Sequence, residues 1–307
     1  MKLAILSRNE ALYSTRRLIE ESKARGWDTN VYDYLKFTVE IMKDELLINY
    51  DGKKIAKPDA IIPRIGASRT FFGAAMVRHF EMWESFCANG SLAITRSRDK
   101  LRALQILSKQ GIDMPKTVFA SNQSDPKDII KLVGGTPLVI KILEGTQGVG
   151  VVLAETQKAA KSVLDAFYGM DVNLLVQEYI EEANGTDIRV FVVGSEVVGA
   201  MKRQGAEGDF RSNLHQGGSA KAVRLSRAEK AVALGAAKAM GLDICGVDMI
   251  PSSRGPLVME VNSSPGLEGI ESATGVNIAG KIMDHIASHL PLQPLLRKRK
   301  PRDKIGA

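Results

Sequence analysis

Three oxygen-bearing side chains near the C-terminal end of the sequence are spaced so that they could bind a metal ion. Residues 248–262 form two short apolar runs on either side of Pro-Ser-Ser-Arg-Gly-Pro, a pattern that predicts a β-hairpin. Glu260 and Asn262 are two residues apart and therefore point to the same face of a strand. If the hairpin is symmetric about its turn, Asp248 lies opposite Met259 or Glu260.

Two carboxylates this close repel each other unless a cation lies between them. Ligands that are all oxygen atoms favour a hard ion, Mg²⁺ or Mn²⁺, and Mg²⁺ usually completes its shell with waters and phosphate oxygens. The spacing alone leaves a second interpretation open, in which the hairpin is solvated and its polar side chains simply face water.

A glycine-rich stretch over residues 144–150 lies between predicted strands at 138–143 and 151–154. Its glycines, including Gly145 and Gly148, would let successive backbone N–H groups approach a phosphate closely. The stretch is neither a P-loop nor a dinucleotide-binding fingerprint, because no Gly-Lys-Ser/Thr follows and it leads into a strand. A flexible hairpin turn is the alternative.

Two lysines could neutralise the charge of a bound phosphate. Lys141 interrupts the apolar strand 138–143, and a lysine inside such a strand is costly to bury without an anion. Lys100 is expected at the start of a helix over 100–110, where the helix dipole disfavours a cation. Each has a simpler alternative: Lys141 could lie at the edge of a sheet, and Lys100 could extend along the surface into water.

The end of the predicted strand 174–180 carries groups that suit a nucleoside. Glu178 is followed nine residues later by Asp187, and the two could lie on either side of it. Backbone groups of Tyr179 and Ile180 could meet an adenine edge, while Asp187 could accept hydrogen bonds from ribose hydroxyls. The spacing by itself is not specific to nucleotides.

A polar, glycine-containing stretch over residues 202–218 is too long for an ordinary loop in a compact domain, which indicates a function. Its cationic and hydrogen-bonding residues are Lys202, Arg203, Arg211, Ser212 and Asn213. Arg189 projects from the predicted hairpin 188–201 beside it. Arginine remains cationic and binds carboxylates and phosphates through paired N–H groups. A solvated hairpin loop is the alternative.

The elements that must hold these residues follow an α/β pattern. In the first ninety or so residues, predicted strands alternate with predicted helices, which indicates a small parallel sheet. The strands are expected at 3–6, 29–32 and 60–63, the helices at 14–25 and 71–86, and a hairpin with an Asp-Gly turn at 48–55.

Two further units follow along the chain. In the second, helices are expected at 100–110, 126–133 and 158–167, and strands at 117–120, 138–143, 151–154 and 174–180. In the third, hairpins are expected at 188–201 and 248–262, with a helix at 231–240.

Bulk composition is that of an ordinary globular enzyme. The chain has 307 residues, enough for two or three lobes, and it is 44% hydrophobic and 25% charged. Its apolar runs are shorter than the roughly 20 residues that span a bilayer. With only Cys87 and Cys245, a disulfide framework or zinc site is not expected, and a reducing cytoplasm is the predicted location.

The net charge of +7 favours anionic partners such as nucleotide phosphates. Part of this charge lies in a C-terminal run that contains Arg297, Lys298, Arg299 and Lys300. The run could be a solvated end, or it could be an arm that contacts RNA or an acidic protein.

Taken together, these features resemble the ATP-grasp fold. The residues whose order and spacing carry the resemblance are Lys100, Lys141, those of the 145–150 loop, Glu178, Asp187, Asp248, Glu260 and Asn262. More narrowly, the sequence is similar to RimK-type α-L-glutamate ligases in the stretches Pro63-Arg64-Ile65-Gly66, Glu144-Gly145-Thr146-Gln147-Gly148, Gly208-Asp209-Phe210-Arg211-Ser212-Asn213 and Met259-Glu260-Val261-Asn262.

The resemblance implies an α/β protein in which two α+β lobes clamp ATP, preceded by a Rossmann-like α/β pre-ATP-grasp domain. The expected boundaries are 1–95 for the N-terminal domain, 96–180 for the central lobe, 181–290 for the C-terminal lobe with the metal site, and 291–307 for the basic tail.

The resemblance also assigns roles. It implies that Lys141, Glu178, Asp187 and residues 211–213 contact the nucleotide, and that Asp248, Glu260 and Asn262 hold two Mg²⁺ or Mn²⁺ ions. The arginine that many ATP-grasp ligases carry two residues before the first metal ligand is Gly246 here. Arg203 or Arg189 is therefore the expected oxyanion-stabilising group, beside Lys141.

The implied reaction is ATP-dependent formation of an amide bond through an acyl phosphate, with L-glutamate as the amine. The resemblance is nearest to enzymes that add glutamates to the C-terminus of a small-subunit ribosomal protein, with poly-α-glutamate as an implied product. Arg64 and the turn 262–267, through Ser264, are the expected substrate contacts, and a homo-oligomer is expected. Two alternatives remain: a small-molecule or carrier-protein acceptor, and a nucleotide-binding, ribosome-associated regulator without turnover.

Overall fold

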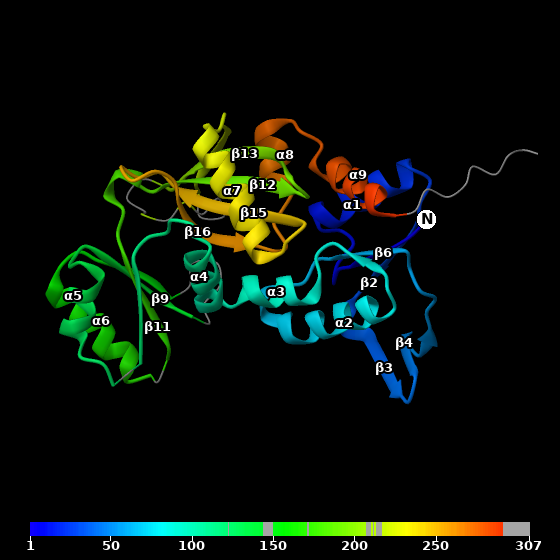
Figure 1. Cartoon of the computed structure of the whole chain (residues 1–307), viewed down its shortest axis with the longest axis horizontal. Coiled ribbons are helices and arrows are strands. Elements are labelled where there is room, and N and C mark those ends of the chain that lie inside the picture. Colours follow the sequence, from blue (N-terminus) through cyan, green and yellow to red (C-terminus); the bar gives the residue numbers. More distant parts are fainter. Residues whose placement is uncertain are drawn as a thin grey trace, which may run out of the picture.

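Helices cover the faces of several β-sheets that follow one another along the chain, as Figure 1 shows for this computed structural model. The structure describes residues 1–121, 123–143, 150–170, 172–206, 210, 212 and 217–290. Within these residues the strands form four sheets. No helix in the same ranges is long and apolar enough to cross a membrane.

The N-terminal sheet is parallel, as the alternation of strands and helices predicts. Its strands lie in the order β2-β1-β6-β7. They are β1 (Lys2–Leu6), β2 (Asp28–Tyr32), β6 (Ala60–Pro63) and β7 (Phe86–Cys87), and the helices of this unit are α1 (Tyr13–Ala24), α2 (Thr70–Met82) and α3 (Ser91–Arg98). Residues 3–6 of β1 are all buried, which is the pattern of a strand covered on both faces.

The predicted helix over 71–86 is wrong at its C-terminal end. Helix α2 ends at Met82, and Phe86 begins strand β7 instead. The helix cannot continue because Glu84 adopts a left-handed backbone conformation with φ of 58°. The helical pattern of the sequence does not reveal that the chain leaves the helix at this position.

A small antiparallel ribbon projects from the N-terminal unit and consists of β3 (Phe37–Met42), β4 (Glu45–Tyr50) and β5 (Lys53–Lys54). Asp51 and Gly52 join β4 to β5 with φ of 47° and 76°. Both angles are positive, as the predicted Asp-Gly hairpin turn requires. Three short 3₁₀ helices also occur among the described residues, at Tyr34–Lys36, Ala67–Arg69 and Glu181–Ala183.

The central unit contains a four-stranded antiparallel sheet in the order β10-β9-β11-β8. Its elements are α4 (Lys100–Lys109), β8 (Thr117–Ala120), α5 (Pro126–Val133), β9 (Leu138–Ile142), β10 (Val151–Ala154), α6 (Gln157–Tyr168) and β11 (Leu174–Glu178). Helices α5 and α6 pack on this sheet and share a separate apolar core with it, which includes Ile130, Leu138 and Leu164.

The C-terminal unit contains a five-stranded antiparallel sheet in the order β14-β13-β12-β15-β16. Its elements are β12 (Thr186–Val193), β13 (Glu196–Gln204), β14 (Ser219–Ala222), α7 (Arg227–Met240), β15 (Ile244–Ile250), β16 (Leu257–Asn262), α8 (Glu268–Thr274) and α9 (Ile278–His289). In β12, Val190 and Val192 pack in one core with residues of α7, whereas Phe191 and Val193 pack in another with residues of α8 and α9. The sheet is therefore covered on both faces.

The N-terminal and C-terminal units share a hydrophobic core. Leu3 and Ile5 of β1 and Leu18 of α1 pack in the same cluster as Ile278 and Ile282 of α9. Figure 1 shows α9 beside α1 in agreement with this contact. The predicted boundaries at residues 95 and 180 stay a prediction, since a continuous core crosses from the first unit to the last.

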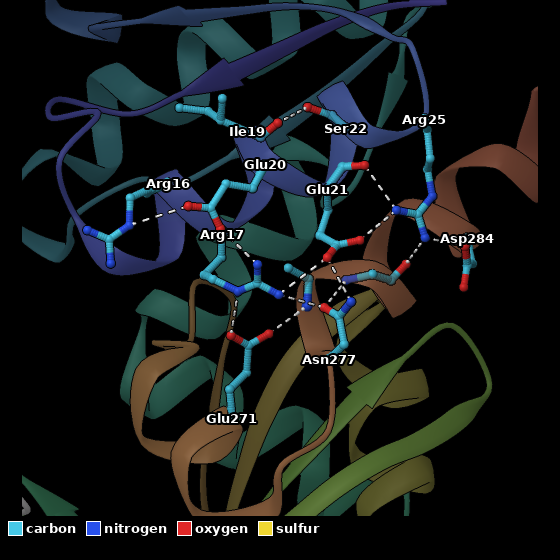
Figure 2. A network of polar contacts seen from close by, with 12 residues as sticks. Arg16, Arg17, Ile19, Glu20, Glu21, Ser22, Arg25, Glu271, Asn277 and Asp284 are labelled. Carbon is cyan, nitrogen blue, oxygen red and sulfur yellow. Dashed lines mark hydrogen bonds and ion pairs between the residues drawn. The ribbon is translucent and has the colours of Figure 1, made fainter.

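A polar network reinforces this junction, and Figure 2 shows it from close by. Glu271 of α8 is buried, and one of its carboxylate oxygens accepts hydrogen bonds from the Tyr13 hydroxyl at 2.9 Å and from Arg17 Nε at 3.1 Å. The other oxygen accepts from the backbone N–H of Ala279 at 3.0 Å. Arg17 also donates to Asn277 Oδ1 at 2.9 Å. The N-terminal and C-terminal units are thus joined by charge as well as by apolar packing.

Replacing Glu271 with alanine should lower the free energy of unfolding by about 3 kcal/mol, because a partly buried arginine and a buried backbone N–H lose their acceptor. Chemical denaturation measures this change. Glu20→Ala is the control, since Glu20 pairs with the same Arg17 at 2.8 Å but is half exposed, and it should cost less than about 1 kcal/mol. Equal losses for the two variants would contradict the assigned role of Glu271.

Candidate active site

The hairpin β15–β16 brings the predicted metal ligands together. Asp248 pairs directly with Glu260, as the symmetric hairpin predicts, and a register shift beside this pair leaves Met259 as an extra residue on β16. Val261 packs in the core under α7, so Glu260 and Asn262 point to the opposite face of the sheet. All three predicted ligands therefore lie on one face.

The neighbouring strands add charged residues to the same face. Arg189 of β12 pairs with Asp248, and Asp187 of β12 pairs with Arg203 of β13. Val190 points into the core under α7, so the residues on either side of it along β12 point the other way. Four strands thus contribute charged or polar side chains to a single surface.

Two arginines hold Asp248. Arg189 Nε donates to Asp248 Oδ1 at 2.7 Å, and Arg189 Nη2 and Arg203 Nη2 both donate to Oδ2, the latter at 2.9 Å. Arg203 also forms a two-pronged pair with Asp187, with Nε at 2.6 Å from Oδ1, and the Ser212 hydroxyl donates to the same carboxylate. Charge thus alternates along a buried network of two acids and two arginines.

Gly246 lies beside Arg189 and packs closely against Pro265. A Cβ atom at position 246 would lie 3.7 Å from both Cδ and Nε of Arg189 and 3.1 Å from Cβ of Pro265. A guanidinium from the neighbouring strand β12 therefore lies beside position 246.

The surroundings lower the pKa of the Asp248 carboxyl and raise the pKa of the Glu260 carboxyl. Burial alone would raise the pKa of Asp248, but the charges of Arg189 and Arg203 outweigh it and hold the pKa at about 2. Loss of solvation raises the pKa of the Glu260 carboxyl, and the nearby charge of Asp248 raises it further. The side chain of Glu260 is nevertheless accessible, and no described residue donates a hydrogen bond to it.

The donor set fits a hard divalent cation. Asp248 is ionised at neutral pH, and Oδ1 accepts only one hydrogen bond from the described residues, so it keeps a lone pair. Asn262 Oδ1 accepts one bond, from the backbone N–H of Ser264 at 3.0 Å, and Glu260 keeps both oxygens. Among the described residues no three His, Cys, Asp or Glu side chains form a metal-binding group, so waters or phosphate oxygens would complete the shell.

The predicted phosphate-binding lysines lie together at the end of β9. Lys141 Nζ donates to Gln177 Oε1 at 2.6 Å. Lys100 Nζ donates to the carbonyl oxygens of Ile142 and Leu143, both at 3.1 Å. The alternative in which Lys100 extends along the surface into water is therefore wrong, because its ammonium binds carbonyl oxygens at the end of β9.

Burial lowers the pKa of both lysines. For Lys141 it lowers the pKa to about 8, with Glu260 opposing the change and Lys100 adding to it. For Lys100 burial is again the main cause, and the charge of Glu260 opposes it. The charge of Glu260 thus acts on both lysines, as expected for neighbouring groups.

The predicted nucleoside contacts are divided between two places. Glu178 lies at the end of β11, where its carboxylate accepts from the Lys116 backbone N–H at 2.7 Å and pairs with Arg254. Tyr179 is half-buried, and Ile180 is buried. Asp187 instead belongs to the arginine network described above, where burial raises the pKa of its carboxyl against the effect of Arg203.

Asn89 is a site-positioning residue that sequence reasoning missed. Its side chain is buried, accepts from the Ile244 backbone N–H at 2.8 Å, and donates to the carbonyl oxygens of Ile244 at 2.7 Å and Ser263 at 2.9 Å. It therefore ties the start of β15 to the end of β16. The sequence carries no signal for this contact, because its partners are 155 and 174 residues away.

The predicted substrate contacts also approach the hairpin. The Ser264 hydroxyl donates to the carbonyl oxygen of Pro63 at 3.4 Å, which joins the turn after β16 to the segment that contains Arg64. The remaining predicted contacts, Gly145, Gly148, Arg211 and Asn213, lie outside the described residues. Strands β9 and β10 flank the glycine-rich stretch 144–150 as predicted, and the backbone N–H of Ile142 donates to Gly150 O at 2.9 Å.

The fold and this site match a known family. Residues 1–94 match the RimK PreATP-grasp domain, and residues 97–286 match the RimK-like ATP-grasp domain. The chain belongs to the RimK family of ATP-grasp ligases, which are ATP-dependent, amide-forming enzymes.

Similar proteins agree with this assignment. A protein of Shewanella loihica named probable alpha-L-glutamate ligase is 62% identical over 286 residues, which cover 93% of this chain and 95% of the relative. One of Vibrio parahaemolyticus with the same name is 60% identical over 286 residues, or 93% and 95% of the two chains. The ATP-grasp ligase PsnB, solved with a phosphomimetic variant of its minimal precursor, Mg and ADP, has the same fold, with a TM-score of 0.72, 20% identity and coverage of 94% and 97%.

Asp248 and Glu260 pair across the hairpin, but replacing Asp248 should destabilise the fold and replacing Glu260 should not. Asp248→Asn leaves two buried arginines undercompensated and should lower the free energy of unfolding at pH 7 by about 2–4 kcal/mol. Because the folded-state pKa of Asp248 is about 2, below its usual value, this contribution is complete above about pH 4 and is lost as the pH falls toward 2.

Chemical denaturation of the wild type and of Asp248→Asn at several pH values measures the difference between their free energies of unfolding. This difference should become smaller in acid. Glu260→Gln is the matched control. Since the pKa of Glu260 is raised, its ionisation opposes folding, and the variant should be at least as stable as the wild type at pH 7 without metal. The assigned role of the network would be contradicted if Asp248→Asn were as stable as the wild type at pH 7. It would also be contradicted if the difference in the free energy of unfolding became larger in acid.

Proposed function

We propose that this protein joins L-glutamate to a carboxylate acceptor by way of an acyl phosphate, with ATP as the second substrate. The acceptor that we propose is the C-terminus of a small-subunit ribosomal protein, to which successive additions would give a poly-α-glutamate tail. The observation that carries the proposal is the set Asp248, Glu260 and Asn262 on one face of the C-terminal sheet, with Glu260 close enough to Lys141 and Lys100 to act on their pKa, in a chain 62% identical to a probable alpha-L-glutamate ligase.

In the first proposed step, an acceptor carboxylate oxygen attacks the γ-phosphorus of ATP, and the bond to the ADP oxygen breaks. Lys141 and Lys100 would bind phosphate oxygens and offset their negative charge. When bound at Asp248, Glu260 and Asn262, Mg²⁺ or Mn²⁺ would neutralise and orient phosphate oxygens. The described residues that we assign to the nucleotide are Glu178, Tyr179, Ile180, Asp187 and Ser212, with the glycine-rich loop and Arg211 and Asn213 as further contacts.

In the second proposed step, the glutamate amine attacks the acyl carbon, loses a proton, and phosphate leaves. Arg189 and Arg203 are suited to stabilise the developing oxyanion, because Asp248 and Asp187 fix their guanidinium planes. No protein nucleophile is needed, so the residues of the site act by positioning and by charge. We propose that Arg64 and Ser264 contact the substrates.

The cytoplasm is the proposed location, and the free state of Cys87 and Cys245 supports it. PsnB, a protein of the same fold, is described with a precursor peptide, which supports a peptide as the acceptor class. Self-association and a role for residues 291–307 in contacting RNA or an acidic protein stay predictions.

Glu260→Ala should abolish ligation while leaving the fold intact. Because Glu260 supplies two unengaged carboxylate oxygens to the proposed metal site, glutamate-dependent ADP release should fall at least about 100-fold. Mass spectrometry of the acceptor measures the product as increments of one glutamate residue. Glu196→Ala, which removes an exposed acid at the start of β13, is the control and should retain activity.

Two results would contradict the proposal in different ways. Turnover by Glu260→Ala at the wild-type rate would reject the metal assignment alone. Wild-type protein that releases no ADP with glutamate and any peptide, small-molecule or carrier-protein acceptor would reject glutamate ligation.

The affinity for ATP should depend on the protonation of Lys141. Its pKa of about 8 in the free protein means that the positive charge is present below pH 8 and lost above it. Between pH 7 and 9, ATP binding by the wild type should therefore weaken about tenfold at most. Lys141→Arg should show a smaller change, because arginine stays protonated. Calorimetric titration at each pH measures the affinity, and equal pH profiles would contradict the role of Lys141.

A further inference from the structure

Two arginines beside the active site have no acidic partner among the described residues. Arg64 follows β6, and its guanidinium makes no hydrogen bond within the described part of the chain. Arg98 ends α3, and it uses Nη2 to donate to the Ile65 carbonyl oxygen at 2.8 Å. Its Nε is buried without a hydrogen-bond partner among the same residues. Unpaired cationic donors in a partly buried position are costly unless an anion binds them.

The two guanidinium groups are neighbours. Arg98 binds the carbonyl of Ile65, the residue that directly follows Arg64. Burial lowers the pKa of Arg64 to about 10, and the positive charge of Arg98 contributes to this decrease. Both side chains remain cationic at neutral pH, so they form a concentrated positive site.

This pair lies at the edge of the proposed metal site. The Ser264 hydroxyl, just after β16, donates to the carbonyl oxygen of Pro63, the residue before Arg64. Burial lowers the pKa of Arg98, and the charge of Glu260 acts against that change, as expected for groups in the same corner. Arg98 is also two residues before Lys100, whose ammonium reaches β9.

The other cations of the site have hydrogen-bond partners and other roles in the proposed reaction. Arg189 and Arg203 bind Asp248 and Asp187, and Lys141 binds Gln177 beside the proposed phosphate position. Arg64 and Arg98 therefore provide positive charge for a different anion. Two guanidinium groups suit a carboxylate, which can accept hydrogen bonds on both oxygens.

We propose that Arg64 and Arg98 form a subsite for the side-chain carboxylate of the amino acid that is added, and so select acidic amino acids over their neutral amides. The proposal rests on the ligase function proposed above and specifies which residues determine the choice of amine substrate. A neutral amide would leave one guanidinium facing an N–H₂ group, which neutralises no charge and can repel it.

Arg64→Gln tests the subsite with little risk to folding, since the guanidinium makes no hydrogen bond within the described residues. The Michaelis constant for glutamate should rise at least about tenfold, and the preference for glutamate over glutamine should fall by a similar factor, because a charged hydrogen bond is lost. The Michaelis constant for ATP should change less than about twofold, since the phosphates are assigned to other residues. Arg78→Gln, on the exposed face of α2, is the matched control and should behave as wild type.

Arg98 needs two variants, because it also binds the Ile65 carbonyl. Arg98→Gln should raise the Michaelis constant for glutamate, and Arg98→Lys should recover part of the loss, which a purely structural role would not require. In the Arg64→Gln/Arg98→Gln double variant, the combined loss should be smaller than the product of the single losses, because both residues bind one carboxylate.

Calorimetric titration with glutamate, glutamine and a peptide that ends in glutamate separates the inference from the proposed function. Glutamate binding that Arg64→Gln weakens, in a wild type without glutamate-dependent ADP release, would support the subsite and reject the ligase activity. If Arg64→Gln ligates glutamate with an unchanged Michaelis constant for glutamate, only the subsite is overturned. If Arg64→Gln weakens binding of the peptide and not of the free amino acid, the assignment to the added amino acid is likewise overturned.

Discussion

A carboxylate buried between two arginines is the interaction on which the site depends. Asp248 cannot be ionised in the interior of a sheet unless its charge is compensated, and Arg189 of β12 and Arg203 of β13 supply that compensation. Arg203 is in turn held by Asp187, so the network extends across three neighbouring strands. Loss of solvation raises the pKa of Glu260, ionised Asp248 raises it further, and a bound cation would relieve this repulsion.

The architecture places this network between separately packed parts of the chain. The N-terminal and C-terminal units share one core and the Glu271 network, whereas the central sheet has a core of its own. Lys141 lies in the central sheet and the acids lie in the C-terminal sheet, whereas Lys100 begins α4, whose Ala103 and Leu107 pack in the core under α7. Lys100 crosses this junction, since its helix follows α3 and its ammonium binds the end of β9.

Several features of the site could be predicted from the sequence because they depend on local periodicity. The two-residue spacing of Glu260 and Asn262 determines that they share a face, and the symmetry of the hairpin places Asp248 opposite Glu260. Parallel alternation of strands and helices likewise predicts the N-terminal sheet. The C-terminal end of α2 was not predictable, because a left-handed residue at Glu84 ends the helix without a glycine or proline.

The sequence by itself thus determined the order of the elements, the ATP-grasp resemblance and the residues able to bind a cation or a phosphate. Tertiary structure decided how those residues are paired: that Arg189 lies over Gly246, that Asn89 ties together the two ends of the ligand hairpin, and that Arg98 stands beside Arg64. The physical reason is the separation along the chain of the residues that interact. Periodicity sets the direction of a side chain within its own strand, whereas compensation of a buried charge or carbonyl depends on whichever distant residue the folded chain brings within hydrogen-bonding distance.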